Sequence, residues 1–383
     1  MKSKKGSIEI QFSWIFILIA GALIVAFFII IVQKQKQLAD VKLSGDIKAD
    51  LSTILTGSRV SRGTSSLIEI PQATIYYDCD GYSVGNLGAI NPGITFSPDT
   101  LKGTGLMMWS LDWNVPFRVD NFLYITSPEI RYIFVTDTNE NIDTSVFSTI
   151  FESEDTTSFP PKTIIHNGDE QLLFNKENAS WQFIMQNNFP NSNNYKIRFI
   201  YKDNPNPTDY SLANFFGEIP NDAVTAVNIK ADTSCNGDIF DCFGKVQFYQ
   251  KDNLGFNDGN PSFLGESYYL GRASVIAAVF AEKPEPYNCQ MKKAFRKLQF
   301  VAQIYFDKAN DLQMYYAAIN DLNCQPVINT AKPTLQALIN TAGDLANNFP
   351  TDADTKIADI YDRINSLETL NNNLQRLSCA EIY

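Results

Sequence analysis

The stretch FSWIFILIAGALIVAFFIIIV, residues 12–32, holds 21 residues and no charge. A helix of this length rises about 1.5 Å per residue and spans the roughly 30 Å hydrocarbon core of a membrane. The stretch is longer than the apolar core of a cleaved signal peptide, and QKQKQ follows it in place of small residues. The sequence therefore predicts a retained transmembrane helix at residues 12–32, preceded by a cytoplasmic basic leader at residues 1–11.

Basic residues are more numerous before the apolar stretch than after it. Lys2, Lys4 and Lys5 precede it together with the amino terminus, whereas Lys34 and Lys36 follow it. Loops on the cytoplasmic side of a membrane carry the excess of Lys and Arg. We therefore expect a single-pass protein of the cell membrane, N-terminus inside, with the bulk of the chain extracytoplasmic.

The composition of the 383-residue chain is that of a folded, acidic protein. Hydrophobic residues make up 44% of it, charged residues 19%, and the formal net charge is −11. Nucleic-acid binding depends on clustered Lys and Arg, so we expect no nucleic-acid partner. The single histidine, His166, excludes a multi-histidine zinc site. The sequence has no phosphate-binding loop or serine-hydrolase motif, and we expect no catalytic activity.

Residues 33–57 are expected to continue the membrane helix outward as a stalk helix. Apolar residues recur among Lys and Asp at helical spacing, and Gly57 follows the last of them. The expected apolar stripe consists of Leu38, Val41, Ile47, Leu51, Ile54 and Leu55.

Residues 58–288 have the pattern of a mixed α/β ectodomain. Short β-branched and aromatic runs alternate with clusters of Gly, Pro, Asn and Asp. The predicted strands lie at 66–70, 73–78, 106–111, 121–126, 131–136, 162–166, 181–185, 196–201, 224–229, 245–249 and 274–280. Helical patterns at 144–151 and 210–216 separate some of them, and the second lies between two strands as in a βαβ unit. A β-sandwich is the alternative if both helical patterns are turns.

Residues 289–383 change to a helical period, with apolar residues in steps of three and four. The first series begins at Ala294 and ends at Leu322. The second begins at Pro333, which suits a first helical turn, and ends before Pro350. A third series occupies residues 357–374. Short connections between three such helices predict a C-terminal antiparallel three-helix bundle.

One loop of the ectodomain carries oxygen ligands at alternate positions. Asp137, Asn139 and Asp143 follow a predicted strand, and such side chains can converge on Ca²⁺ or Mg²⁺. Ile142 replaces the glycine of an EF-hand loop, and turns rich in Asn and Asp form without metal for local hydrogen-bonding reasons. A solvated turn is the favoured interpretation and a divalent-cation site is the alternative. No other cofactor is expected.

Three further features concern contacts outside the cell. Asn178 begins an Asn-Ala-Ser sequon and is a candidate glycosylation site. Trp109 and Trp113 share one face of a predicted strand, where they either pack in the core or line a glycan platform. A basic cluster, either a solvated face or a contact for an anionic partner, consists of Lys292, Lys293, Arg296 and Lys297.

The N-terminus resembles the class III leader of archaeal type IV pilin-like proteins, because KKGSIE at residues 4–9 is followed by QFSWIFILIAG. The resemblance implies cleavage between Gly6 and Ser7 by a membrane peptidase, a long spine helix and assembly into a filament. The family usually carries Glu at the fifth residue after the cut, whereas this chain has Gln11 there and Glu9 at the third. The same run, together with WSLDWNVPFRVDNFLYITSPEIRYIFV, is also similar to uncharacterised single-pass surface proteins of archaea.

All six cysteines follow the membrane helix, which in an exported region predicts up to three disulfides. A helix over about residues 290–322 holds its ends roughly 50 Å apart, so Cys289 cannot reach Cys324. An up-down-up bundle brings Cys379 to Cys324 instead. A short loop separates Cys235 from Cys242, which leaves Cys289 for Cys79. The predicted bonds are Cys324–Cys379, Cys235–Cys242 and Cys79–Cys289.

These features together predict a membrane-anchored extracytoplasmic surface protein with a structural or binding role. Its expected partners are the membrane, through residues 12–32, and a protein or glycan at the cell surface. The alternative is a pilin-like filament subunit processed after Gly6, whose partner is a second copy of the chain in a homo-oligomer or filament.

Overall fold

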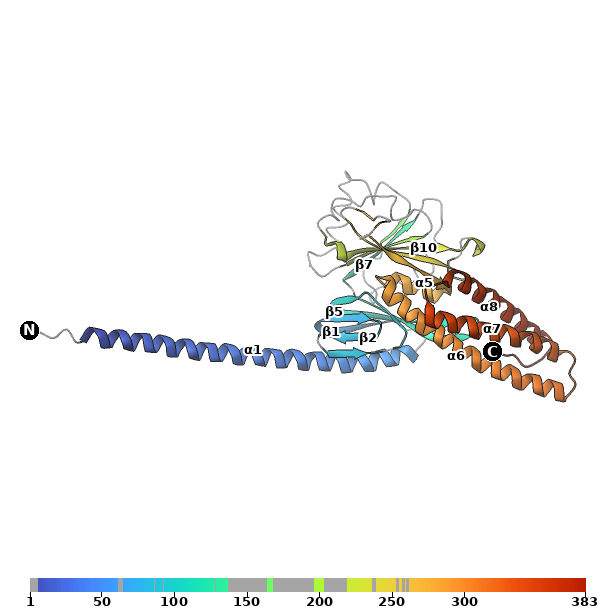
Figure 1. Cartoon of the computed structure of the whole chain (residues 1–383), viewed down its shortest axis with the longest axis horizontal. Helices are drawn as coiled ribbons and strands as arrows, with labels where there is room; N and C mark the ends of the chain where they lie inside the picture. The colour runs from blue at the N-terminus through green and yellow to red at the C-terminus, as the bar shows by residue number, and fades with distance from the viewer. Residues whose placement is uncertain are drawn as a thin grey trace, which may run out of the picture.

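The computed structural model describes residues 6–60, 65–136 without 86, 92 and 128, 164–167, 196–202, 219–252 without 236–238, 255–256, 259 and 262–383. These residues form a long N-terminal helix, two six-stranded sheets and a set of C-terminal helices (Figure 1). The mixed α/β class predicted from the sequence is confirmed. The helical patterns at 144–151 and 210–216 and the predicted strand at 181–185 lie outside the described residues.

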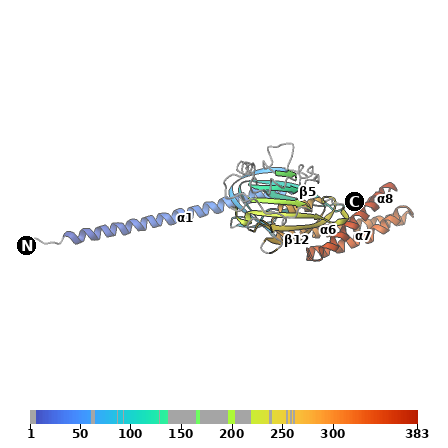
Figure 2. The ribbon, with the colours of Figure 1, turned by 90° about the horizontal axis from the view of Figure 1, so that it is seen from above.

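Helix α1 (Gly6–Val60) is continuous over 55 residues. Its N-terminal part projects away from the rest of the molecule, and its C-terminal part lies along the first sheet (Figures 1 and 2). Ile47, Leu51 and Leu55 recur every four residues and are buried against that sheet. The predicted stripe is wrong at Leu38 and Val41, which are 70% and 56% exposed because the helix has not yet reached the sheet there.

The first sheet has the strand order β3-β2-β1-β5-β6-β4. Its strands are β1 (Ser65–Asp78), β2 (Gly81–Val84), β3 (Leu87–Ile90), β4 (Thr95–Phe96), β5 (Thr100–Asn114) and β6 (Arg118–Thr126). All pairs are antiparallel except β4 with β6. The predicted strands at 66–70 and 73–78 are one strand, β1, whose register against β5 shifts between Glu69 and Ala73. Pro71 lies in this irregularity, where its missing N–H costs no ladder hydrogen bond.

The second sheet has the strand order β12-β11-β10-β9-β7-β8. Its strands are β7 (Ile130–Thr136), β8 (Ile164–Asn167), β9 (Lys196–Lys202), β10 (Val224–Ala231), β11 (Phe243–Gln250) and β12 (Phe263–Leu270). The four strands β10, β9, β7 and β8 are parallel, and β11 and β12 are antiparallel additions. The parallel pair of β9 and β10 agrees with the predicted βαβ unit, although its crossover at 203–218 lies outside the described residues.

Helix α5 (Gly271–Phe280) is buried between the two sheets and corrects the strand predicted at 274–280. The segment is apolar all round, and a short continuous apolar run does not distinguish a buried strand from a buried helix. The alanines at 273, 277 and 278 favour the helix, and Gly271, with a φ of 73°, allows the sharp turn from β12 into it. The layers are therefore sheet, helix and sheet.

The C-terminal helices are α6 (Pro284–Ala318), α7 (Cys324–Asn348) and α8 (Ala353–Arg376). Helix α6 packs on α7, and α7 packs on α8. Helix α6 begins before the predicted boundary at 289 and also contacts β4, β6 and β12, so it joins both sheets to the helices that follow. The prediction that Pro333 opens the second helix is wrong. Pro333 lies inside α7, and Pro326 occupies the first turn.

Candidate functional site

The apolar part of α1 is the most distinctive surface of the described residues. Fourteen large apolar side chains between residues 14 and 32 are 51% to 73% exposed on all sides of the helix. The helix has the length and composition to cross a membrane. We call residues 14–32 the anchor surface.

The C-terminal part of α1 packs on the first sheet and so joins the anchor surface to the folded part of the chain. Lys48 Nζ donates a hydrogen bond to the Gly88 carbonyl, and Leu51 is only 1% exposed. Gly85, with a φ of 58°, faces Ser44 of α1, whose hydroxyl would lie 3.2 Å from any added Cβ. A glycine is therefore required where the helix passes the β2–β3 turn.

The structure locates the residues predicted for processing but not those predicted for metal or glycan. Gly6 and Ser7 form the start of α1, the apolar helix that cleavage between them would leave at the new N-terminus. Asp137, Asn139, Asp143 and Asn178 lie outside the described residues. Within the described ranges, no group of three metal-ligating side chains comes together.

Three disulfides link parts of the two sheets and the C-terminal helices, and their pairing agrees with the prediction. The bonds are Cys79–Cys289, Cys235–Cys242 and Cys324–Cys379, with Cα–Cα distances of 5.6, 5.9 and 5.7 Å. The first joins the β1–β2 turn to α6, the second closes the turn before β11, and the third joins the start of α7 to the C-terminal segment. Disulfides of this kind are typical of proteins in oxidising compartments.

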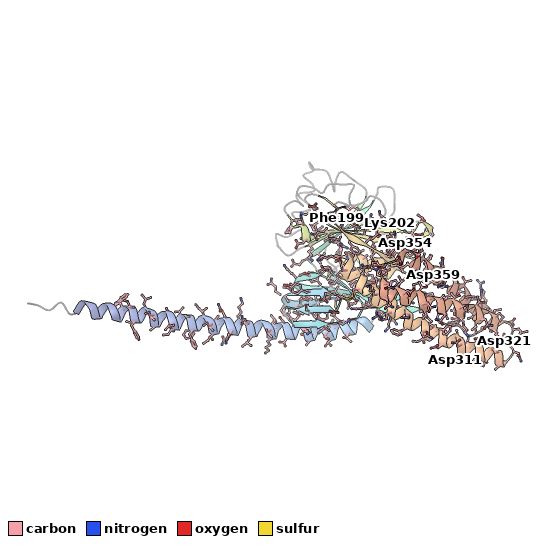
Figure 3. The ribbon with its side chains drawn as sticks, in the orientation of Figure 1. Phe199, Lys202, Asp311, Asp321, Asp354 and Asp359 are labelled. Atoms are coloured by element: carbon pink, nitrogen blue, oxygen red, sulfur yellow. A yellow bond between two sulfur atoms is a disulfide. The ribbon has the colours of Figure 1, made fainter. Side chains whose placement is uncertain are left out.

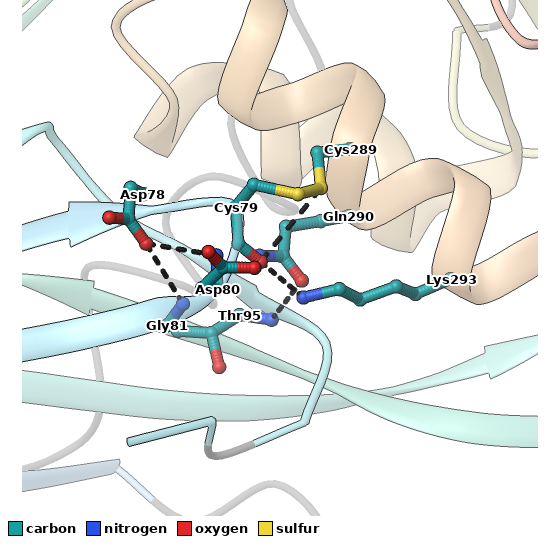
Figure 4. Close-up of a disulfide and its surroundings, with 8 residues drawn as sticks. All are labelled: Asp78, Cys79, Asp80, Gly81, Thr95, Cys289, Gln290 and Lys293. Carbon is teal, nitrogen blue, oxygen red and sulfur yellow. Dashed lines mark hydrogen bonds between the residues drawn. A yellow bond between two sulfur atoms is a disulfide. The ribbon is translucent and has the colours of Figure 1, made fainter. Parts of the chain in front are cut away.

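Hydrogen bonds reinforce the bond between Cys79 and Cys289 (Figure 4). Lys293 Nζ and Gln290 Nε2 both donate to the Cys79 carbonyl, the second at 3.5 Å. The Thr95 N–H donates to Gln290 Oε1 at 3.5 Å. This end of the first sheet is therefore fastened to α6 by covalent and polar contacts together.

Two members of the predicted basic cluster serve the same junction. Burial lowers the pKa of Lys293, and the nearby carboxylates of Asp80 and Asp78 partly oppose this shift. Lys297 Nζ lies 3.9 Å from Asp120 Oδ2 of β6. Two of the four basic residues thus join α6 to the first sheet. This role differs from both predicted ones, which were a solvated face and a contact for an anionic partner.

A cavity of about 660 Å³ opens where the first sheet, α5 and α8 meet. Its walls come from residues 111–115 at the end of β5, 240–242 of the disulfide loop, 270–273 at the start of α5, and α8. The charged and amide side chains of the lining are Asp112, Asn114, Asp241, Arg272, Asn365 and Glu368. Arg272 Nε is buried and has no hydrogen-bond partner among the described residues. Carboxylates, amides and a guanidinium can hold a small polar ligand, and the described lining contains no serine, histidine or free thiol.

The two predicted platform tryptophans are core residues. Trp113 is 1% exposed and its Nε1 donates to the Leu270 carbonyl at 3.0 Å. Trp109 is partly buried and packs on Tyr124, with ring centroids 5.1 Å apart. The glycan-platform alternative is therefore not supported at this strand.

A buried arginine that the sequence did not single out holds the end of α5. Arg198 of β9 donates from Nε to the Val279 carbonyl at 3.1 Å and from Nη2 to the carbonyls of Ala278, at 3.0 Å, and Ala281. These carbonyls lie at the helix C-terminus, where backbone acceptors lack helical partners and the dipole favours a cation. Burial lowers the pKa of Arg198 to about 10, and the nearby Glu282 carboxylate opposes this shift.

No protein-family model, curated protein or solved structure matches the chain. The features that indicate a function are therefore those of the chain itself, namely the anchor surface, the three disulfides and the fold.

Proposed function

We propose that this chain is a membrane-anchored extracytoplasmic surface protein with a structural or binding role. The observation that supports this proposal most strongly is the anchor surface, an apolar helix that projects from a folded ectodomain and is uncovered on all sides (Figure 1). Each large apolar side chain is worth about 1.5 to 3 kcal/mol when removed from water, so exposure of fourteen of them costs tens of kcal/mol. A lipid bilayer removes this cost.

The orientation in this proposal is N-terminus inside. The basic residues at positions 2, 4 and 5 favour it, and so do the disulfides, all of which follow the anchor surface. The proposal also includes an archaeal origin, carried by the resemblance of the leader, and an antiparallel three-helix bundle formed by α6, α7 and α8. It includes no catalytic activity. A divalent cation at Asp137, Asn139 and Asp143 stays a prediction.

Fractionation of cells that express the full chain tests the anchor. We expect the chain to stay with membranes after washing in alkaline carbonate, which releases peripheral proteins. A chain that starts at residue 33 and is exported by a cleavable signal peptide is the matched comparison, and we expect it in the soluble fraction. Full-length chain released by carbonate would contradict the proposal.

The second candidate function, a pilin-like filament subunit, is favoured by the geometry of α1. The helix runs without a break from Gly6 to the first sheet, so cleavage after Gly6 would expose an apolar helix that ends in a rigid head. The same segment of neighbouring copies would then cover the anchor surface. Intact mass of the mature chain separates the two proposals. Retention of residues 1–6 supports the simple anchor, and a quantitative Ser7 terminus supports the filament.

A further inference from the structure

Helix α6 leaves one face uncovered along its distal half. Phe300, Ile304, Tyr315 and Ile319 are 61%, 64%, 58% and 54% exposed. The opposite face is buried against α7 and the sheets. We call the uncovered stripe the outer face; its residues are Phe300, Ile304, Lys308, Asp311, Tyr315 and Ile319.

The spacing of the outer face is symmetric. Its six residues follow one another in steps of four, four, three, four and four, which keeps them on one side of a helix. The steps read the same in both directions. Apolar residues occupy both ends, and Lys308 and Asp311 occupy the centre with opposite charges.

We propose that the outer face binds the outer face of a second copy of this chain, with the two α6 helices antiparallel. The two-fold axis passes between Ala309 and Asn310. Three kinds of contact then form, each of them twice because a two-fold interface is self-complementary. They are Phe300 with Ile319, Ile304 with Tyr315, and Lys308 with Asp311.

The charges on the outer face favour a second copy of the chain as the partner and an antiparallel arrangement of the two α6 helices. Lys308 and Asp311 form no ion pair with another described residue, so both charges are available to a partner. A parallel pair in the same register would place Lys308 beside Lys308 and Asp311 beside Asp311, and like charges in contact oppose association. The antiparallel pair replaces both repulsions with attractions.

The pairing has a consequence for the anchors, and this consequence alone rests on the proposed function. Both α1 and α6 run from N-terminus to C-terminus along the long axis of the molecule in the same sense (Figure 1), and Asp311 lies toward the end of the molecule distant from the N-terminus (Figure 3). A two-fold axis across α6 therefore directs the two anchors to opposite sides. The contact therefore joins two copies whose anchors lie in two surfaces that face each other.

Spin-label distances on the full chain in non-ionic detergent test the pairing. The native cysteines are all in disulfides, so one introduced cysteine carries the label. Arg296→Cys and Leu322→Cys lie near opposite ends of the outer face, and each lies about 40 Å from its own symmetry mate in the antiparallel pair at 1.5 Å rise per residue. A mixture of the two labelled chains should add a distance below about 20 Å, because Arg296 then faces the Leu322 end of its partner.

Charge variants give the second arm. We expect Lys308→Glu to weaken dimerisation at least tenfold by light scattering, and the double variant Lys308→Glu with Asp311→Lys to restore it. Lys230→Glu, on β10, is the matched control and should leave dimerisation unchanged. A monomer at all accessible concentrations, short distances in either singly labelled sample, or a double variant no better than Lys308→Glu would overturn the proposal. None of these outcomes bears on membrane anchoring, which carbonate washing measures separately.

Discussion

Arg198 shows at the residue scale how a single buried cation can fix the position of a helix. Its guanidinium donates hydrogen bonds to carbonyls at the end of α5, and it is 2% exposed. We expect Arg198→Met to destabilise the folded chain by about 3 to 5 kcal/mol, because the buried acceptors lose their donor. Thermal unfolding followed by circular dichroism measures the loss. Lys230→Met on the neighbouring strand is the control, and an equal effect of both substitutions would contradict this role of Arg198.

The three disulfides should differ in their contributions to stability. In the chain-entropy model the stabilisation grows with the length of the closed loop, and the three bonds close 210, 55 and 7 residues. Replacing both cysteines of a pair by serine should cost about 5 kcal/mol for Cys79–Cys289, about 4 for Cys324–Cys379 and about 2 for Cys235–Cys242. Melting temperatures of the three double variants check this order. The reverse order would show that the unfolded-state loops do not control the effect.

Asp359 makes the contact between α7 and α8 sensitive to acid. Burial favours its neutral form, but hydrogen bonds from Arg363 and from Thr341, at 2.9 Å, outweigh burial and hold the pKa of Asp359 below its ordinary value of 3.8. The unfolded chain therefore binds the proton more tightly, so this contribution is present above about pH 4 and is lost as the pH falls through the folded pKa. We expect Asp359→Asn to flatten the fall in melting temperature below about pH 4. If the melting temperature of the variant falls as steeply below about pH 4, other carboxylates cause the fall.

At the scale of elements, the sequence predicts those parts of the fold whose signal is local. The apolar run of α1 and the helical spacing of α6 to α8 are long enough to be unambiguous. Strands β2, β3 and β4 have only two to four residues, and Gly265, with a φ of 140°, interrupts the pattern of β12. The sequence does not predict these strands, because pairing with neighbouring strands, and not the local residue pattern, determines them.

The cavity and Arg198 could not be predicted for a related reason. Residues from four segments far apart in the sequence line the cavity, and none of these segments carries a motif of its own. Arg198 lies in a strand that is buried on both faces. In the sequence, however, a charged residue between apolar residues indicates a side chain that faces solvent, because many strands alternate between a buried and an exposed face. The disulfides were predictable because the rise of a helix alone excludes Cys289 with Cys324.

The seat of α1 on the first sheet gives a test at the same scale. Leu51 is 1% exposed between the helix and the sheet, and Leu51→Ala should cost about 2 to 5 kcal/mol through lost burial and the cavity left behind. Asp50→Ala, one position away on the solvent side, should change stability by less than about 0.5 kcal/mol. Chemical denaturation of the full chain in detergent measures both. Equal effects would show that the helix is not seated as described.

At the scale of the whole molecule, an uncovered apolar helix is joined to a folded part that three disulfides cross-link. Two sheets enclose α5, and α6, which Cys79–Cys289 fastens to the first sheet, packs on α7. The seat of α1 then fixes this assembly to the anchor. These connections join the sheets, the C-terminal helices and α1 to one another, and in the proposed function the membrane helix holds them outside the cell.

Labelling of intact cells with a membrane-impermeant maleimide tests this claim most directly. Because the native cysteines are in disulfides, Leu38→Cys, at a position 70% exposed just beyond the anchor surface, supplies a single reactive thiol. Leu377→Cys, after α8, supplies a second site in a separate chain. We expect both chains to be labelled on intact cells as fully as after lysis. Labelling of either chain only after lysis would contradict it.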